Sequence, residues 1–154
     1  MLQINDKAPN FSLRNQNDEL INLKDYNGKK VILYFYPKDN TPGCTTQACS
    51  FRDYNALLKD LNVVTLGISY DDLKSHSNFH SKYNLNFDIL SDTNHVVAKE
   101  YGVYKEKNLI GKKLPSITRS TFIINENGYL EKAMYNVSAQ NNPKEVYEYL
   151  KNNN

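Results

Sequence analysis

The chain has 154 residues, and its 19 basic and 17 acidic side chains leave a formal net charge of +2. This length fits one domain spanning residues 1–154, and the 40% hydrophobic and 12% aromatic content argues against a disordered chain. The scattered lysines argue against nucleic-acid or membrane partners, no apolar run approaches the roughly 20 residues that span a bilayer, and two cysteines exclude a disulfide-stapled scaffold.

The first residues contain neither a basic leader nor an apolar core, so we expect no signal peptide and a soluble, cytoplasmic protein. Residues 11–14 and 20–23 flank a turn-forming segment, which predicts a small β-hairpin. Residues 31–36 and 63–69 are nearly continuous runs of apolar, β-branched or aromatic side chains. Such runs are typical of strands that are buried on both faces.

Shorter strands are predicted in the second half of the chain, at residues 87–90 and 121–124. The sequence Asn-Glu-Asn-Gly at 125–128 then predicts a turn into a further strand at 129–135, because Asn-Gly supplies the positive φ angles of hairpin turns. The lysine-rich segment 104–118 predicts a solvated loop, with contact to a partner as the alternative.

Helices are predicted between these strands. Apolar residues recur every three or four positions over 45–61, which indicates an amphipathic helix. Residues 71–83 and 93–101 predict two shorter helices, and the last helix begins with Asn142 as the cap, Pro143 at the first helical position and Glu145 placed for a capping box. This alternation predicts an α/β fold whose central β-sheet is partly parallel and flanked by helices, with an N-terminal β-hairpin.

The candidate for chemistry is Cys44, because it falls at the start of the helix that follows the buried strand 31–36. Unpaired amides and the helix dipole stabilise an anion at that position, so they lower the pKa of a thiol. A thiol with a pKa of about 8.5 is roughly 3% ionised at pH 7, and one with a pKa of about 6 is roughly 90% ionised. The alternative is a buried cysteine that serves as a small apolar residue.

Cys49 follows five positions later. On an unbroken α-helix the Cα atoms of the two cysteines lie about 8.7 Å apart, whereas a disulfide tolerates about 4.4–6.8 Å. A bond between Cys44 and Cys49 therefore requires part of the helix to unwind. The alternative is that Cys49 is an ordinary helical residue that never pairs.

Other candidates have weaker support. His76 and His80 have the spacing of two zinc ligands on one helix, but about 26 residues separate them from the cysteines, and an amphipathic surface helix explains both. A Cys-His dyad with either of them or with His95 lacks a local signature. Arginine is scarce, which draws attention to Arg52 on the helix of Cys44 and to Arg119 before the strand at 121–124.

The sequence from Tyr34 to Asp53, which contains Pro37-x-x-x-Thr41-x-x-Cys44, resembles the active-site motif of the peroxiredoxins, and in particular the PrxQ or bacterioferritin comigratory protein subfamily. The resemblance covers nearly the whole chain. It implies a thioredoxin-like fold and a thiol-dependent peroxidase that reduces hydrogen peroxide and organic hydroperoxides. It implies no metal, haem or flavin cofactor, and a monomer that is re-reduced by thioredoxin or a similar dithiol.

The same resemblance assigns roles to residues. Cys44 is implied to be the peroxidatic cysteine, and Cys49 the resolving cysteine that forms an intramolecular disulfide with it. The Thr41 hydroxyl, the amides of Gly43 and Cys44, and Arg119 are implied to hold the peroxide, with Pro37 shielding the thiolate. Arg52 is a further candidate for the network around Cys44.

One position departs from the common pattern, because Gln47 stands where many members of the subfamily carry Glu, and this removes a carboxylate near the thiolate. Two alternative functions remain open. A dithiol reductase would be expected to have a Cys-x-x-Cys pair, whereas four residues separate Cys44 from Cys49 here. A redox sensor or chaperone would be oxidised without catalytic turnover.

Overall fold

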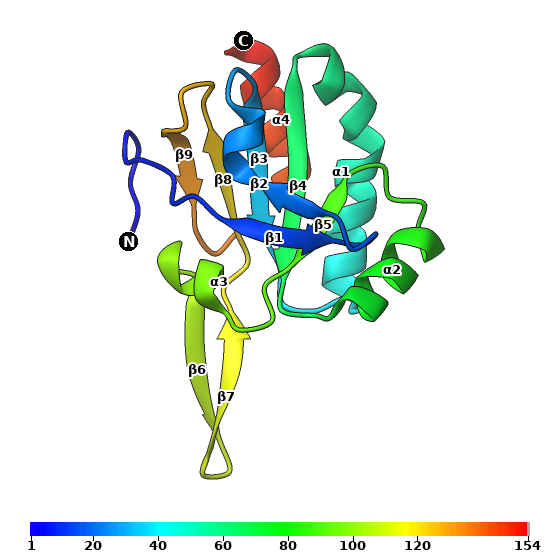
Figure 1. The fold of residues 1–154 in the computed structure, drawn as a ribbon, viewed down its shortest axis with the longest axis vertical. Helices are drawn as coiled ribbons and strands as arrows, with labels where there is room; N and C mark the ends of the chain where they lie inside the picture. The colour runs from blue at the N-terminus through cyan, green and yellow to red at the C-terminus, as the bar shows by residue number, and fades with distance from the viewer. Residues whose placement is uncertain (154) are drawn as a thin grey trace.

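The computed structural model describes residues 1–153, and its central feature is a seven-stranded mixed sheet (Figure 1). The strand order is β2-β1-β5-β4-β3-β8-β9. Strands β3, β4 and β5 run parallel, and β1, β8 and β9 pair antiparallel to their neighbours. The strands of this sheet are β1 (Ser12–Asn15), β2 (Leu20–Asn22), β3 (Lys30–Phe35), β4 (Val63–Ser69), β5 (Asp88–Ser91), β8 (Ser120–Ile124) and β9 (Leu130–Met134).

Helices cover both faces of this sheet. They are α1 (Pro42–Asp60), α2 (Leu73–Lys82), α3 (Val96–Glu100) and α4 (Asn142–Asn152), with a short 3₁₀ helix, η1 (Leu23–Tyr26). Successive residues of β3 point to opposite faces: Tyr34 packs with side chains of α1, α2 and α4, and Phe35 packs with side chains of α3. Every residue of β3 is buried, as predicted for a strand covered on both sides. The α/β thioredoxin-like fold and the N-terminal hairpin are confirmed.

The structure corrects three sequence predictions. Helix α1 begins at Pro42, so it starts three residues earlier than expected. Helix α4 is preceded by Asn141 as the cap residue, and neither this residue nor Asn142 forms the predicted capping box. The fully buried side chain of Asn142 instead accepts a hydrogen bond of 2.6 Å from the Thr121 hydroxyl and ties α4 to β8.

The segment predicted as a loop is the third correction. It forms β6 (Tyr104–Leu109) and β7 (Lys112–Ile117), a two-stranded antiparallel sheet that extends below the main sheet in Figure 1. Ile110 and Gly111 between the strands both have positive φ angles, 49° and 72°, as a tight hairpin turn requires. Within residues 1–153, none of the helices combines the length and the apolar character needed to cross a bilayer.

Candidate active site

The carboxyl end of β3 leads through residues 36–41 directly into α1, so the backbone itself places Cys44 at the first turn of a helix. Cys44 is the third residue of α1 and is 1% exposed. The first amides of an α-helix lack partners within the helix, and the positive end of the helix dipole lies there. An anionic sulfur or a developing negative charge on oxygen is therefore stabilised at this position.

Arg119 reaches the sulfur from the segment between β7 and β8. Its Nη2 lies 3.5 Å from Cys44 Sγ, and its Nη1 donates a 2.6 Å hydrogen bond to Gln47 Oε1. Gln47 lies one turn beyond Cys44 on α1 and is fully buried, so the amide holds the guanidinium against the cysteine. A Cβ on Gly43 would lie 3.2 Å from Arg119 Nη2, which explains why the residue before Cys44 has no side chain.

Thr41 and Pro37 border this arrangement. Thr41 is the residue that precedes α1; its backbone is extended and its carbonyl accepts a 2.9 Å bond from the Thr45 amide. The Thr41 hydroxyl donates to the Lys38 carbonyl at 2.8 Å, so its oxygen keeps its acceptor capacity. Pro37 and Arg119 line a cavity of about 600 Å³ that opens to the surface.

Beneath the helix start, the side chain of Tyr34 closes the site. It belongs to the same buried cluster as Cys44 and stacks on Phe51 with a centroid separation of 4.6 Å. Burial raises the pKa of Tyr34 well above its usual value, and the neighbouring Cys44 charge adds to this effect. A Cβ on Gly67 would lie 2.9 Å from Tyr34 Cζ, so the glycine of β4 makes room for this ring. Cys44 therefore belongs to a buried cluster with the aromatic rings of Tyr34 and Phe51, from which water is excluded.

Asp39 anchors the loop that carries Thr41. Its carboxylate accepts a 2.6 Å hydrogen bond from the Tyr36 hydroxyl, contacts His76 Nδ1 at 2.7 Å and accepts a bond from Ser75 at 2.8 Å, and its amide donates to Asp71 at 2.9 Å. This network joins the active-site loop to α2. Sequence reasoning missed it, because nothing local links an aspartate before α1 to residues more than 30 positions away.

The two histidines of α2 have structural partners. His76 is completely buried and lies between Asp39 and the Leu90 carbonyl, to which its Nε2 donates at 3.0 Å. His76 therefore lies with Phe79 on the buried face of α2, in keeping with the amphipathic helix that the sequence predicts. The ligand atoms of Asp39, Asp71 and His76 lie within 4.8 Å of one another, and among the described residues this is the group with metal-like spacing; it contains neither cysteine.

Arg52 does not take part in the site. Its guanidinium donates to the Tyr83 carbonyl at 2.7 Å and pairs with Asp53, so the expectation that it supports Cys44 is wrong. Cys49 is half-buried, and both cysteines are free thiols on a continuous α1. An unbroken helix keeps their Cα atoms about 8.7 Å apart, too far for a disulfide.

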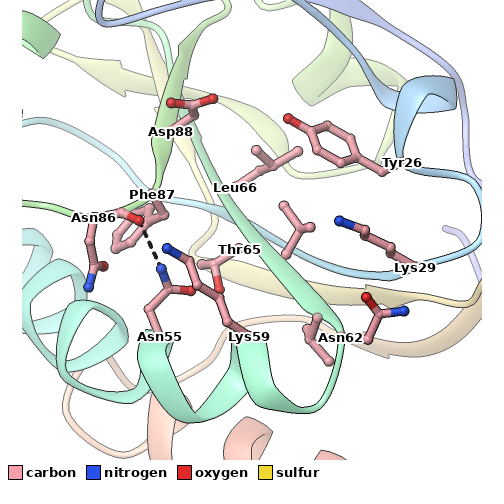
Figure 2. Close-up of a pocket in the computed structure, with 12 residues that line it drawn as sticks. Tyr26, Lys29, Asn55, Lys59, Asn62, Thr65, Leu66, Asn86, Phe87 and Asp88 are labelled. Carbon is pink, nitrogen blue, oxygen red and sulfur yellow. Dashed lines mark hydrogen bonds between the residues drawn. The ribbon is translucent and has the colours of Figure 1, made fainter.

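A second cavity lies away from the predicted site residues. It has a volume of about 310 Å³ and lies between the end of α1, the start of β4 and the segment before β5 (Figure 2). Figure 2 shows Asn55 donating to the Asn86 backbone carbonyl, at 2.8 Å, at one wall of this cavity. Neither cysteine lines this cavity, and the predicted site residues lie at the other end of α1.

Comparison with known proteins agrees with this geometry. The sequence model of the AhpC/TSA family matches residues 4–133. A putative peroxiredoxin bcp of Coxiella burnetii is 47% identical over 145 residues, which are 94% of this chain and 96% of the relative. Peroxiredoxin Bcp of Escherichia coli is 43% identical over 150 residues, 97% of this chain and 96% of the relative.

Two solved structures are also similar. A PrxQ mutant of Xylella fastidiosa has a TM-score of 0.93 at 32% identity, covering 99% of this chain and 98% of the other. The bacterioferritin comigratory protein of Xanthomonas campestris, described with an alkyl peroxide reduction activity, has a TM-score of 0.88 at 32% identity, covering 93% and 91% of the two chains.

Proposed function

The chain belongs to the AhpC/TSA family of peroxiredoxins, in the Bcp/PrxQ subfamily, and from this premise we propose that Cys44 is the sulfur that attacks the peroxide. The protein is a thiol peroxidase. The observation that carries the assignment is the 3.5 Å contact between Arg119 and Cys44 Sγ at the first turn of α1. A cation and free amides at one sulfur stabilise its thiolate and the charge that develops on a peroxide oxygen.

The first step is the reduction of the peroxide. The Cys44 thiolate attacks the terminal oxygen of ROOH, the O–O bond breaks, and its electron pair leaves with the RO⁻ group, which takes up a proton to become water or an alcohol. Cys44 is oxidised to the sulfenic acid. We assign the guanidinium of Arg119, the Thr41 hydroxyl and the amides of Gly43 and Cys44 to hold the peroxide in line with the sulfur. Pro37 shields the thiolate at the cavity mouth.

The second step resolves the sulfenic acid. The Cys49 thiolate attacks the Cys44 sulfur, a disulfide forms, and the hydroxyl leaves as water after taking up a proton. Because α1 holds the cysteines too far apart, its first turns must unwind before this bond forms. A dithiol reductant, which we propose to be thioredoxin, then returns both cysteines to thiols as its own dithiol becomes a disulfide.

We take hydrogen peroxide and alkyl hydroperoxides as the substrates, in keeping with the alkyl peroxide reduction activity of the Xanthomonas relative. The proposed working unit is a monomer whose single domain spans residues 1–154. We place it in the cytoplasm, where a thioredoxin pool keeps thiols reduced.

The test is turnover of the purified protein with thioredoxin, thioredoxin reductase and NADPH, across hydrogen peroxide and several alkyl hydroperoxides. NADPH consumption should continue over many equivalents of peroxide, and Cys44→Ser should abolish it. Oxidation that stops after one equivalent, despite an active reductant, would contradict the proposal.

A further inference from the structure

The β6–β7 hairpin stands out from the body of the molecule beside the active site. It forms a sheet of its own and extends below the seven-stranded sheet in Figure 1. Its tip is strongly exposed, since Ile110 is 95% and Leu109 is 58% accessible to solvent. Apolar side chains gathered at the exposed tip of a projecting element indicate a contact surface.

The two faces of the hairpin differ in charge. Cross-strand partners share a face of an antiparallel pair, and alternate residues along each strand belong to the same face. One face, here called the lysine face, combines three lysines with two leucines and no acidic residue. It consists of Lys105, Lys107, Leu109, Lys112, Leu114 and Ser116. The opposite face carries Lys113 together with Glu106, the one acidic residue of the hairpin, so its charges cancel.

The lysine face borders a cavity that also includes Arg119 and Pro37. The cavity of about 600 Å³ that contains Arg119 also includes Lys105, Lys107 and Ser116. A third cavity, of about 360 Å³, shares Pro37, Lys107, Ser116 and Ile117 with it and continues to Leu109 and Leu114, and it is also lined by Asn108 and Pro115. The face therefore continues outward toward the hairpin tip from a cavity that includes Arg119, the residue in contact with Cys44 Sγ.

We propose that the lysine face is the docking surface for the protein that reduces this peroxidase, a dithiol protein with an acidic and partly apolar surface. The proposal rests on the proposed function, since only the oxidised enzyme needs such a partner. The lysine face carries three positive charges and no acidic residue, so it attracts an acidic partner and increases the rate of association. The exposed leucines supply apolar area at the centre of the contact.

A protein fits this surface better than a small ligand does. Ile110 and Lys112 line neither cavity, so a molecule held inside the cavities would leave the tip uncovered. A protein surface can cover the tip and the cavity mouth together. Docked there, the partner's thiolate attacks one sulfur of the Cys44–Cys49 disulfide, and the other sulfur leaves as a thiolate that takes up a proton. The partner's second thiolate then attacks the partner's sulfur in the mixed disulfide and releases the remaining enzyme sulfur in the same way. The partner ends as a disulfide and both cysteines as thiols.

The test uses two neighbouring lysines that lie on opposite faces. Lys112→Glu reverses a charge on the lysine face, and Lys113→Glu makes the same change on the other face, with both side chains exposed. In turnover driven by a bacterial thioredoxin, its reductase and NADPH, we expect Lys112→Glu to raise the KM for thioredoxin about fivefold or more. The KM of Lys113→Glu should stay within about twofold of the native value, and added salt should raise the native KM more than that of Lys112→Glu.

Turnover driven by dithiothreitol, a small uncharged dithiol, serves as the control and should be the same in both variants. Equal effects of the two substitutions on the KM for thioredoxin, or no effect of either, would overturn the proposal. So would a rise in the KM for a carboxylate-bearing hydroperoxide in Lys112→Glu under dithiothreitol, which would assign the face to substrate. A native protein that fails to turn over even with dithiothreitol would refute the proposed function itself.

Discussion

Replacement of Arg119 by alanine tests the core of the active-site geometry. The substitution removes the 3.5 Å contact with Cys44 Sγ and the 2.6 Å hydrogen bond to Gln47. A hydrogen bond to a charged group contributes about 1.5–3 kcal/mol, which corresponds to a rate reduction of about 12- to 160-fold if the contact acts in the transition state. Arg119→Lys keeps the charge, but one ammonium cannot span both partners as the guanidinium does, so we expect an intermediate rate.

The assay is a single-turnover reaction of the reduced protein with hydrogen peroxide. Since the chain contains no tryptophan, remaining thiol should be trapped in quenched flow and measured by mass. The matched control is Arg52→Ala, because Arg52 lies on α1 but contacts Tyr83 and Asp53 rather than the cysteine. It should react within about twofold of the native rate. Oxidation of Arg119→Ala within about threefold of the native rate would refute the assigned role.

Three further results are expected. Cys49→Ser, treated with one equivalent of peroxide, should retain a sulfenic acid by intact mass, whereas the native protein should not; a native protein that keeps the Cys44 sulfenic acid with Cys49 still free would contradict resolution by Cys49. Gly67→Ala pushes a methyl group against Tyr34, so it should lower the free energy of unfolding by about 1–3 kcal/mol in calorimetry; unchanged stability would show that the ring moves freely. Burial lowers the pKa of His80, so the unfolded state binds more protons as the pH falls through about 6.5. Native stability should decrease there, and His80→Gln should flatten the slope in denaturant titrations.

The buried elements of the fold were predictable from local patterns. The run at 63–69 coincides with β4, and that at 31–36 lies within one residue of β3, because strands covered on both faces are apolar throughout. The hairpin of β6 and β7 was not predicted from the sequence, for the opposite reason. Its strands are exposed and rich in lysine, and Ile110 stands at a turn position with positive φ where Asn is the usual signal.

The site was predictable where residues are close in sequence. The order of strand and helix placed Cys44 at the helix start, and the resemblance added Gly43 and Thr41, which lie within one helical turn of it. Arg119 was identified because arginine is scarce in this chain and because the sequence resembles the peroxiredoxins, not from any local pattern. The contact between Asp39 and His76 spans 37 positions, and only the folded chain brings the two residues together.

The anchoring of the active-site loop has a kinetic consequence. Asp39 is fixed by its carboxylate to buried partners, and Phe51 is buried at the other end of the segment that we propose to unwind. The intervening segment of about ten residues is therefore a loop that is fixed at both ends. The ends of a flexible loop of this length come together in about 10–100 ns. Typical enzymes turn over only about 1–1,000 times per second. Rewinding of the helix start, once both cysteines are thiols again, should therefore be fast compared with one turnover.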